Sequence, residues 1–131
     1  MAQVLTSDTV CTIYLAGRTG SAAPFGEPGP SSVAKAVRAC FTAYGYVCTQ
    51  HPVSNVRMDF ANETSAKSTC EIPCYHWLAD GRMLLAPVAY EDEMVRVGGV
   101  WKIAERSIIA ARFWMAECYA PNPLDPTSAK P

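Results

Sequence analysis

Two histidines, His51 and His76, are the only imidazole side chains in the 131-residue chain. A neutral imidazole has a pKa of about 6.5 and can therefore accept a proton at neutral pH. His51 directly precedes Pro52, and a single histidine in that position is usually structural. The sequence thus leaves two interpretations of His51 open: a general base in a pocket, and a structural side chain.

A single arginine interrupts a strand-like segment of mostly apolar residues near the end of the chain. Alternation in a strand would place this residue, Arg106, on the same face as Ala104. Ile103 and Glu105 would then lie on the opposite face. A guanidinium in this position could hold an oxyanion or a departing anion. It could equally form an ion pair with Glu105 of a neighbouring strand or with Glu93.

Cys74 and His76 are two residues apart in another strand-like segment and would share one of its faces. Either side chain could line the same pocket, or both could lie on the sheet surface. Tyr90 and Trp77 are further candidates for the pocket, although aromatic packing in a core or interface is the simpler interpretation. Neither a Ser-His-Asp arrangement nor a glycine-rich phosphate loop is visible.

The cysteines do not indicate a disulfide framework or a metal site. The chain has six, at positions 11, 40, 48, 70, 74 and 118, with no Cys-x-x-Cys pair and no tight cluster with histidine. Residues 1–8 lack the positive region and apolar run of a secretory signal. We therefore expect buried free thiols in a cytoplasmic protein, with no metal and no organic cofactor.

One helix is predicted in the first half of the chain. A strand-like segment at 9–15 and a loop rich in glycine and proline at 17–30 precede it. Ser31 or Ser32 is the predicted N-cap, and Gly45 is the predicted C-terminal stop. The helix has one apolar stripe, formed by Val33, Ala36, Val37, Cys40, Phe41 and Tyr44.

After this helix the apolar residues recur with period two. The predicted strands are 52–60, 64–78, 82–97 and 100–113, with tight turns at Asp80-Gly81 and Gly98-Gly99. In the first of these strands Val56, Met58 and Phe60 share one face. Pro73 and Pro87 fall inside two strand patterns, so they imply bulges or an edge and bend the sheet.

These elements predict a single α+β domain: a strongly curved antiparallel sheet wrapped around the helix, with a cone-shaped pocket. The domain is expected over residues 1–118, followed by a proline-rich tail at 119–131. Half of the residues are apolar, 18% are charged and the net charge is −1. Such a composition argues against nucleic acid as a partner, and no apolar run is long enough for a membrane helix.

Two blocks of the sequence resemble a known family. Residues 90–104, with the Gly98-Gly99 turn followed by Val-Trp-Lys-Ile, resemble the final hairpin of SnoaL-like domains in the nuclear transport factor 2-like superfamily. Thr49-Gln50-His51 and Asn55-Val56-Arg57 resemble the segment that carries the catalytic histidine of scytalone dehydratase and gamma-hexachlorocyclohexane dehydrochlorinase. The bile acid dehydratases have a similar arrangement. The resemblance covers about residues 10–115.

The resemblance implies roles for some of these residues. His51 falls on the histidine that removes a proton from a substrate carbon, and Arg106 falls on an arginine near the leaving group. Asn55, Cys74, His76, Tyr90 and Trp77 become candidates for the substrate pocket. Scytalone dehydratase has a second histidine just after a proline, whereas Pro73 here is followed by Cys74.

The resemblance also implies two helices before the first strand, one of which supplies an aspartate partner for the histidine. This chain begins at what looks like that first strand, so we expect the N-terminal helices and the aspartate to be missing; Asp8 is badly placed for that role. A start codon further upstream would also explain the difference.

The expected function is therefore a cofactor-independent lyase, either a dehydratase or a dehydrochlorinase, or an isomerase, with His51 as base and a small apolar ring compound as substrate. The alternative is a non-catalytic module that binds a hydrophobic ligand or dimerises, because the carboxylate-bearing helix is missing. A homodimer or homotrimer is expected in either case, because the low charge favours a covered apolar surface.

Overall fold

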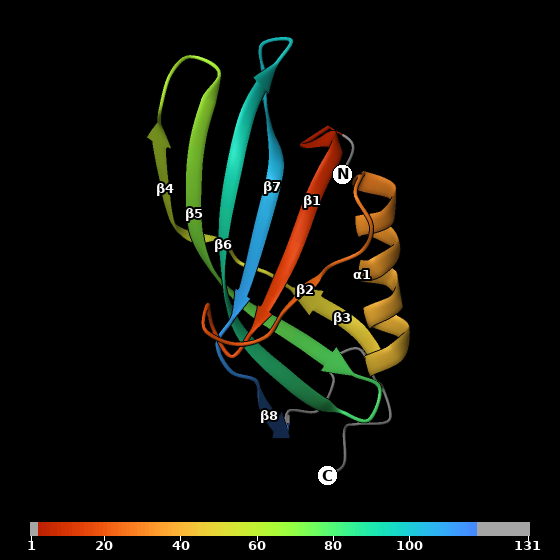
Figure 1. Ribbon diagram of the computed structural model, residues 1–131. Helices are drawn as coiled ribbons and strands as arrows, with labels where there is room; N and C mark the ends of the chain where they lie inside the picture. Colours follow the sequence, from red (N-terminus) through yellow and green to blue (C-terminus); the bar gives the residue numbers. More distant parts are fainter. Residues whose placement is uncertain (1–2, 118–131) are drawn as a thin grey trace.

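The computed structural model describes residues 3–117, which form one curved, open, eight-stranded sheet with a single helix (Figure 1). This is the α+β class that the sequence predicts. The helix is α1 (Pro30–Tyr44), and the strands are β1 (Leu5–Leu15), β2 (Ala22–Pro24), β3 (Tyr46–Gln50), β4 (Ser54–Phe60), β5 (Ser65–Leu78), β6 (Arg82–Val97), β7 (Val100–Ala110) and β8 (Trp114–Glu117). The predicted domain boundary at 118 and the predicted tail at 119–131 lie outside the described residues.

The strands follow the order β2-β1-β7-β6-β5-β3, with β4 also paired to β5 and β8 also paired to β6. Every pair is antiparallel except β1–β7, which is parallel. The predicted antiparallel sheet is therefore confirmed except for the parallel β1–β7 pair. Figure 1 shows that α1 lies beside β1, β2 and β3 and leaves β4 uncovered on the far side.

The two faces of the sheet differ in what covers them. We use the term inner face for the face of the sheet that carries the buried core, formed by Ile72, Cys74, Ala86, Val88 and Ala110. These residues are cross-strand neighbours on β5, β6 and β7. The outer face carries the alternate residues, which are more polar.

The helix begins and ends at residues with special backbone conformations. Gly29 is the N-cap with φ 103°, Pro30 occupies the first turn, and no side chain caps the helix. The predicted Ser31 or Ser32 cap is therefore wrong, because the helix begins earlier, at a proline suited to the first helical position. Gly45 ends it, as predicted, with φ 68° and an N–H donated to the Phe41 carbonyl.

Only part of the predicted apolar stripe is covered. Val33 is buried, whereas Phe41 and Tyr44 are 37% and 61% exposed. The helix has 15 residues, and within residues 3–117 there is no helix of the length and apolarity that crossing a membrane requires.

The two strand prolines face each other across β5 and β6, where Pro73 pairs with Pro87 without any shift of register. The predicted bulge is therefore absent at this point, and the alternative, an edge, explains both residues. On the far side of β5 the partner changes from β3 to β4 around Pro73, and on the far side of β6 it changes from β8 to β7 around Pro87. Proline has no N–H to donate to a neighbouring strand. Both prolines lie where the far side of their strand has no paired neighbour, so no hydrogen bond is lost there.

Both predicted hairpin turns are present. Gly81 has φ 86° after Asp80, and Gly98 and Gly99 have φ 58° and 82°. At Gly98-Gly99 both central residues have positive φ, as a type I′ turn requires, and the twist of such a turn matches that of paired strands.

A bulge between β6 and β7 changes which residues of β7 are buried. The register shifts between Glu93 and Met94, so that Met94 pairs with Ile103 and Ala104 is skipped. Ile103 is consequently 8% exposed and belongs to the core. The sequence predicted Ile103 on the opposite face from Ala104 and Arg106. That prediction assumed regular alternation without a bulge, so it did not give the burial of Ile103.

Candidate functional site

The structure brings both histidines together with one cysteine. Thr49 pairs with His76 in the β3–β5 ladder, so His51, directly after β3, lies beside Cys74 and His76 of β5. The two imidazole rings are 5.2 Å apart and nearly perpendicular. One potential ligand atom from each of His51, Cys74 and His76 lies within 4.8 Å of the others. The sequence predicted that Cys74 and His76 share one strand face, and the resemblance placed both in one pocket with His51. The approach of all three ligand atoms to within 4.8 Å was not predicted.

Aromatic rings hold His76 in place. Tyr46 stacks on the His76 ring at 4.4 Å, and Phe41 of α1 contacts Tyr46 edge-on at 5.9 Å. The chain segment from α1 into β3 therefore fixes one wall of the cluster. Tyr46 was not identified from the sequence; its position directly after the helix stop at Gly45 was the available signal.

Burial sets the protonation states of the cluster. His51 is exposed as a whole residue, but the partial desolvation of its ring lowers its pKa. Burial lowers the pKa of His76, and the neighbouring His51 lowers it further. Burial also raises the pKa of the Cys74 thiol to about 11. At neutral pH both imidazoles are therefore uncharged and the thiol keeps its proton.

Within residues 3–117 no carboxylate forms a hydrogen bond or ion pair with His51, and burial is the sole cause of its pKa shift. The Nδ1 atom of His76 is buried without a hydrogen-bond partner. Both imidazoles thus lack the polar partner that would fix their tautomers.

Arg106 has a different environment from either of the two that the sequence suggested. Its partner is Asp92, directly opposite on β6, which accepts hydrogen bonds from Nε at 2.8 Å and from Nη2 at 2.7 Å. Asp92 has a side chain only 4% exposed. Neither Glu105 nor Glu93, the partners that the sequence left open, forms a hydrogen bond or ion pair with Arg106. The guanidinium charge is consequently neutralised by a bidentate carboxylate.

Tyr90 completes this group on the inner face. The Arg106 guanidinium lies over the Tyr90 ring at 4.1 Å from its centre. Burial raises the pKa of Tyr90 to about 12, so its hydroxyl stays protonated. Although burial alone would lower the pKa of Arg106, its hydrogen bonds to Asp92 raise it, and the ion pair persists at neutral pH.

Two of the candidate pocket residues lie away from the histidines. Trp77 alternates with His76 along β5 and stacks on Tyr75 of the outer face, with ring centres 6.2 Å apart. Asn55 sits in a bulge of β4 with φ 50° and donates a hydrogen bond from Nδ2 to Glu71 at 2.7 Å. Trp77 and Asn55 therefore do not join the His51 cluster.

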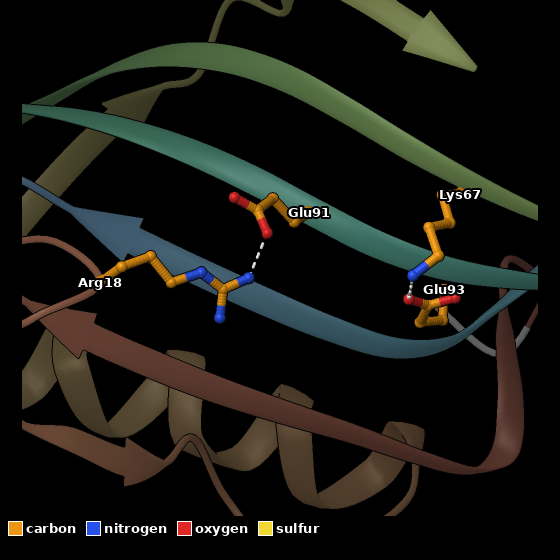
Figure 2. A network of polar contacts seen from close by, with 4 residues as sticks. All are labelled: Arg18, Lys67, Glu91 and Glu93. Carbon is orange, nitrogen blue, oxygen red and sulfur yellow. Dashed lines mark hydrogen bonds and ion pairs between the residues drawn. The ribbon is translucent and has the colours of Figure 1, made fainter. Parts of the chain in front are cut away.

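A cavity of about 490 Å³ lies between β4, β5 and β6, with Asn55, Glu71 and Glu91 among its lining residues. It does not include the histidine cluster. The nearby outer face carries two ion pairs, Arg18 with Glu91 and Lys67 with Glu93, which Figure 2 shows along β6. These ion pairs occupy the charges of Glu91 and Glu93, whereas Tyr90, which also lines the cavity, belongs to the inner face.

The sequence matches the profile of the SnoaL-like domain over residues 11–107. The chain therefore belongs to the SnoaL-like domain family, and its fold is that of the nuclear transport factor 2-like superfamily. No curated protein matches it.

Solved structures agree with this assignment. A type 2 hexachlorocyclohexane dehydrochlorinase has a TM-score of 0.73 at 22% identity, over 95% of this chain and 79% of that one. The type 3 enzyme from Novosphingobium barchaimii LL02 has a TM-score of 0.72 at 19% identity, over 92% and 79% of the two chains. A putative scytalone dehydratase from Novosphingobium aromaticivorans DSM 12444 has a TM-score of 0.63 at 23% identity, over 92% and 75%. At these identities the likeness establishes the fold alone.

Proposed function

We propose that the chain is a lyase, a dehydratase or dehydrochlorinase, or an isomerase, that acts on a small apolar ring compound with His51 as its base. The observation that carries this proposal is the position of His51 on the inner face, beside His76 and Cys74 and next to the apolar core. The solved structures similar to this chain include dehydrochlorinases and a putative scytalone dehydratase, which supports the same reaction class.

In an elimination, His51 would take a proton from a substrate carbon. The electron pair of that C–H bond would form a carbon–carbon double bond, while the bond to the leaving group on the adjacent carbon breaks. Halide would leave as an anion, and hydroxide would leave as water after receiving a proton. Tyr90 and Cys74, both protonated at neutral pH, are the donors that the inner face offers for this step.

Arg106 has a narrower role in this proposal than its sequence position suggested. Its charge is already matched by Asp92, so it adds little attraction for a free anion. It acts instead as a positioning residue, because its guanidinium covers one side of the Tyr90 ring.

The test is a panel of halogenated, hydroxylated and ketone-bearing rings, assayed for elimination and for exchange of substrate hydrogen with deuterated water. His51→Gln should lower kcat/KM by at least about 100-fold, the usual contribution of general-base catalysis. Cys48→Ser, at an exposed position on the neighbouring β3, is the matched control and should have no effect. Turnover or exchange that is unchanged in His51→Gln would contradict the proposal.

A non-catalytic binding module is the second candidate. It is favoured by the lack of a carboxylate on His51 among the described residues, since such a partner stabilises the imidazolium that forms during proton transfer. This function predicts saturable binding of apolar ring compounds with neither turnover nor deuterium exchange. Ligand-detected NMR on the same panel separates the two candidates.

A further inference from the structure

His51, Cys74 and His76 have the composition of a metal site. Imidazole nitrogens and cysteine thiolates are the ligand types that zinc prefers. The Cys74 thiol would release its proton to solvent as the ion binds. Three protein ligands with an open fourth position are typical of zinc sites that bind a further molecule. Within residues 3–117 these are the residues of this kind whose ligand atoms come within 4.8 Å of one another.

We propose that His51, Cys74 and His76 bind a divalent transition metal ion, Zn²⁺ in the first place, on the inner face of the sheet. One ligand comes from the β3–β4 connection and two come from β5. The fourth position would be open to water or to a small ligand.

The geometry needs only a small adjustment. Ligand atoms around tetrahedral zinc are about 3.3–3.6 Å apart, given the usual Zn–N and Zn–S bond lengths. The present atoms lie within 4.8 Å, so a movement on the order of 1 Å would close the site. Cys74 and His76 are fixed on one strand, whereas His51 lies in the short connection between β3 and β4 and is exposed. His51 can therefore move to complete the site.

An unsatisfied atom supports the same conclusion. His76 Nδ1 is buried and has no hydrogen-bond partner, which is costly for a polar atom in the interior. A metal ion bonded to that nitrogen would remove the cost. Cys74 is buried, is not part of a disulfide, and forms only a weak contact of 3.7 Å from its sulfur to the Ile72 carbonyl. Its sulfur is thus available as a ligand.

A metal ion at this site would occupy a ring nitrogen of His51. Metal binding itself does not depend on the lyase reaction. Its effect on turnover does rest on that proposed function: zinc bound to His51 would prevent this residue from accepting a proton and would inhibit the reaction. Failure of the zinc proposal and failure of the lyase proposal are distinguishable, because binding is measured without any substrate.

The experiment uses the protein without a histidine tag, after a chelator has removed any bound metal. The protein is then titrated with Zn²⁺ in competition with a chromophoric chelator. One ion per chain is expected, with at least about a tenfold loss of affinity in Cys74→Ser and in His76→Ala, since even groups beyond the ligands contribute that much. Cys70→Ser is the matched control, because Cys70 lies on the same strand and is not among the three ligands. It should bind zinc as the unchanged chain does.

A second measurement covers variants that fail to fold. Co²⁺ added to the unchanged chain should give a thiolate-to-cobalt charge-transfer band, and zinc should protect Cys74 from alkylation when the labelled peptides are mapped. Cobalt binding without the thiolate band would overturn the proposal, and so would zinc affinity that is equal in the unchanged chain and in folded Cys74→Ser.

Discussion

At the scale of single residues, a bidentate ion pair on the inner face joins Asp92 to Arg106. The Asp92 side chain is 4% exposed and the Arg106 side chain 24%, so each charge depends on the other for its solvation. Breaking a buried pair by removing one partner leaves an uncompensated charge, which usually costs more than the pair contributed.

Asp92→Asn should therefore lower the free energy of unfolding by about 3 kcal/mol, because the Arg106 charge would lose its carboxylate. Urea unfolding followed by tryptophan fluorescence measures this. Glu93→Gln, which removes the partner of Lys67 on the outer face, is the matched control and should change stability by less than about 0.5 kcal/mol. Equal losses in the two variants would contradict the assigned burial of Asp92.

His76 should make stability depend on pH. Its folded-state pKa is lowered by burial and by His51, so the unfolded chain takes up the proton more readily. Stability should be highest above the unfolded-state pKa of about 6.5 and should be lost as the pH falls from there through the folded-state value. Urea unfolding with a chelator present, at pH 7.5 and below 6, tests this sign.

In His76→Phe, which can keep a ring against Tyr46 but cannot titrate, the dependence on pH should become weaker. His51, which also has a lowered pKa, would supply the remainder. A steeper loss of stability with acid in His76→Phe would show that another group is responsible.

The sequence identified His51, Cys74, His76 and Arg106 by residue type, but it could not give their partners. Counting back from the Gly98-Gly99 turn places Glu91 opposite Arg106. The bulge that skips Ala104 moves that position to Asp92, and nothing in the local pattern announces a bulge.

At the scale of elements, local signals sufficed where the chain turns on itself. The boundaries of β6 and the stop of α1 at Gly45 follow from glycines with positive φ. β2, β3 and β8 were not predicted, because strands of three, five and four residues show too little alternation. They form only through pairing with β1, β5 and β6, respectively. The strand predicted to end at Phe113 ends at Ala110 in the structure. Past this point along β6, the paired strand is β8 instead of β7.

The β6–β7 turn gives a prediction at this scale. Gly99→Ala should cost about 1 kcal/mol, because a residue with a Cβ is strained at positive φ. Gly98→Asn is the matched control and should be tolerated, since asparagine is favoured at the first central position of a type I′ turn. No atom crowds either glycine, so the difference would report backbone strain alone. Thermal unfolding of both variants measures it; an equal loss would exclude this turn geometry.

At the scale of the whole molecule, the inner face is covered unevenly. α1 covers the part beside β1 and β3, whereas β4 at the other side has no helix over it (Figure 1). Val56 and Phe60 of β4, on the face predicted to be apolar, are 64% and 62% exposed. The sequence predicted the curved sheet and, from the low charge, an apolar surface covered by another copy of the chain. Which residues form that surface depends on how far α1 reaches.

This apolar surface underlies the remaining prediction, which concerns the expected homodimer or homotrimer. Large exposed apolar patches on native proteins usually mark interaction surfaces. We expect sedimentation velocity to show a mass that rises with concentration toward a dimer or trimer. The double change Val56→Asp and Phe60→Asp should keep the chain monomeric, because each new carboxylate would lose its hydration in the contact.

Val97→Asp is the control for that experiment. Val97 is 52% exposed and lies at the end of β6, beside the Gly98-Gly99 turn, so it tests an exposed apolar side chain outside β4. It should leave the association unchanged. A chain that stays monomeric at every concentration would contradict the prediction, and association lost through Val97→Asp alone would move the interface from β4 to the tip of the β6–β7 hairpin.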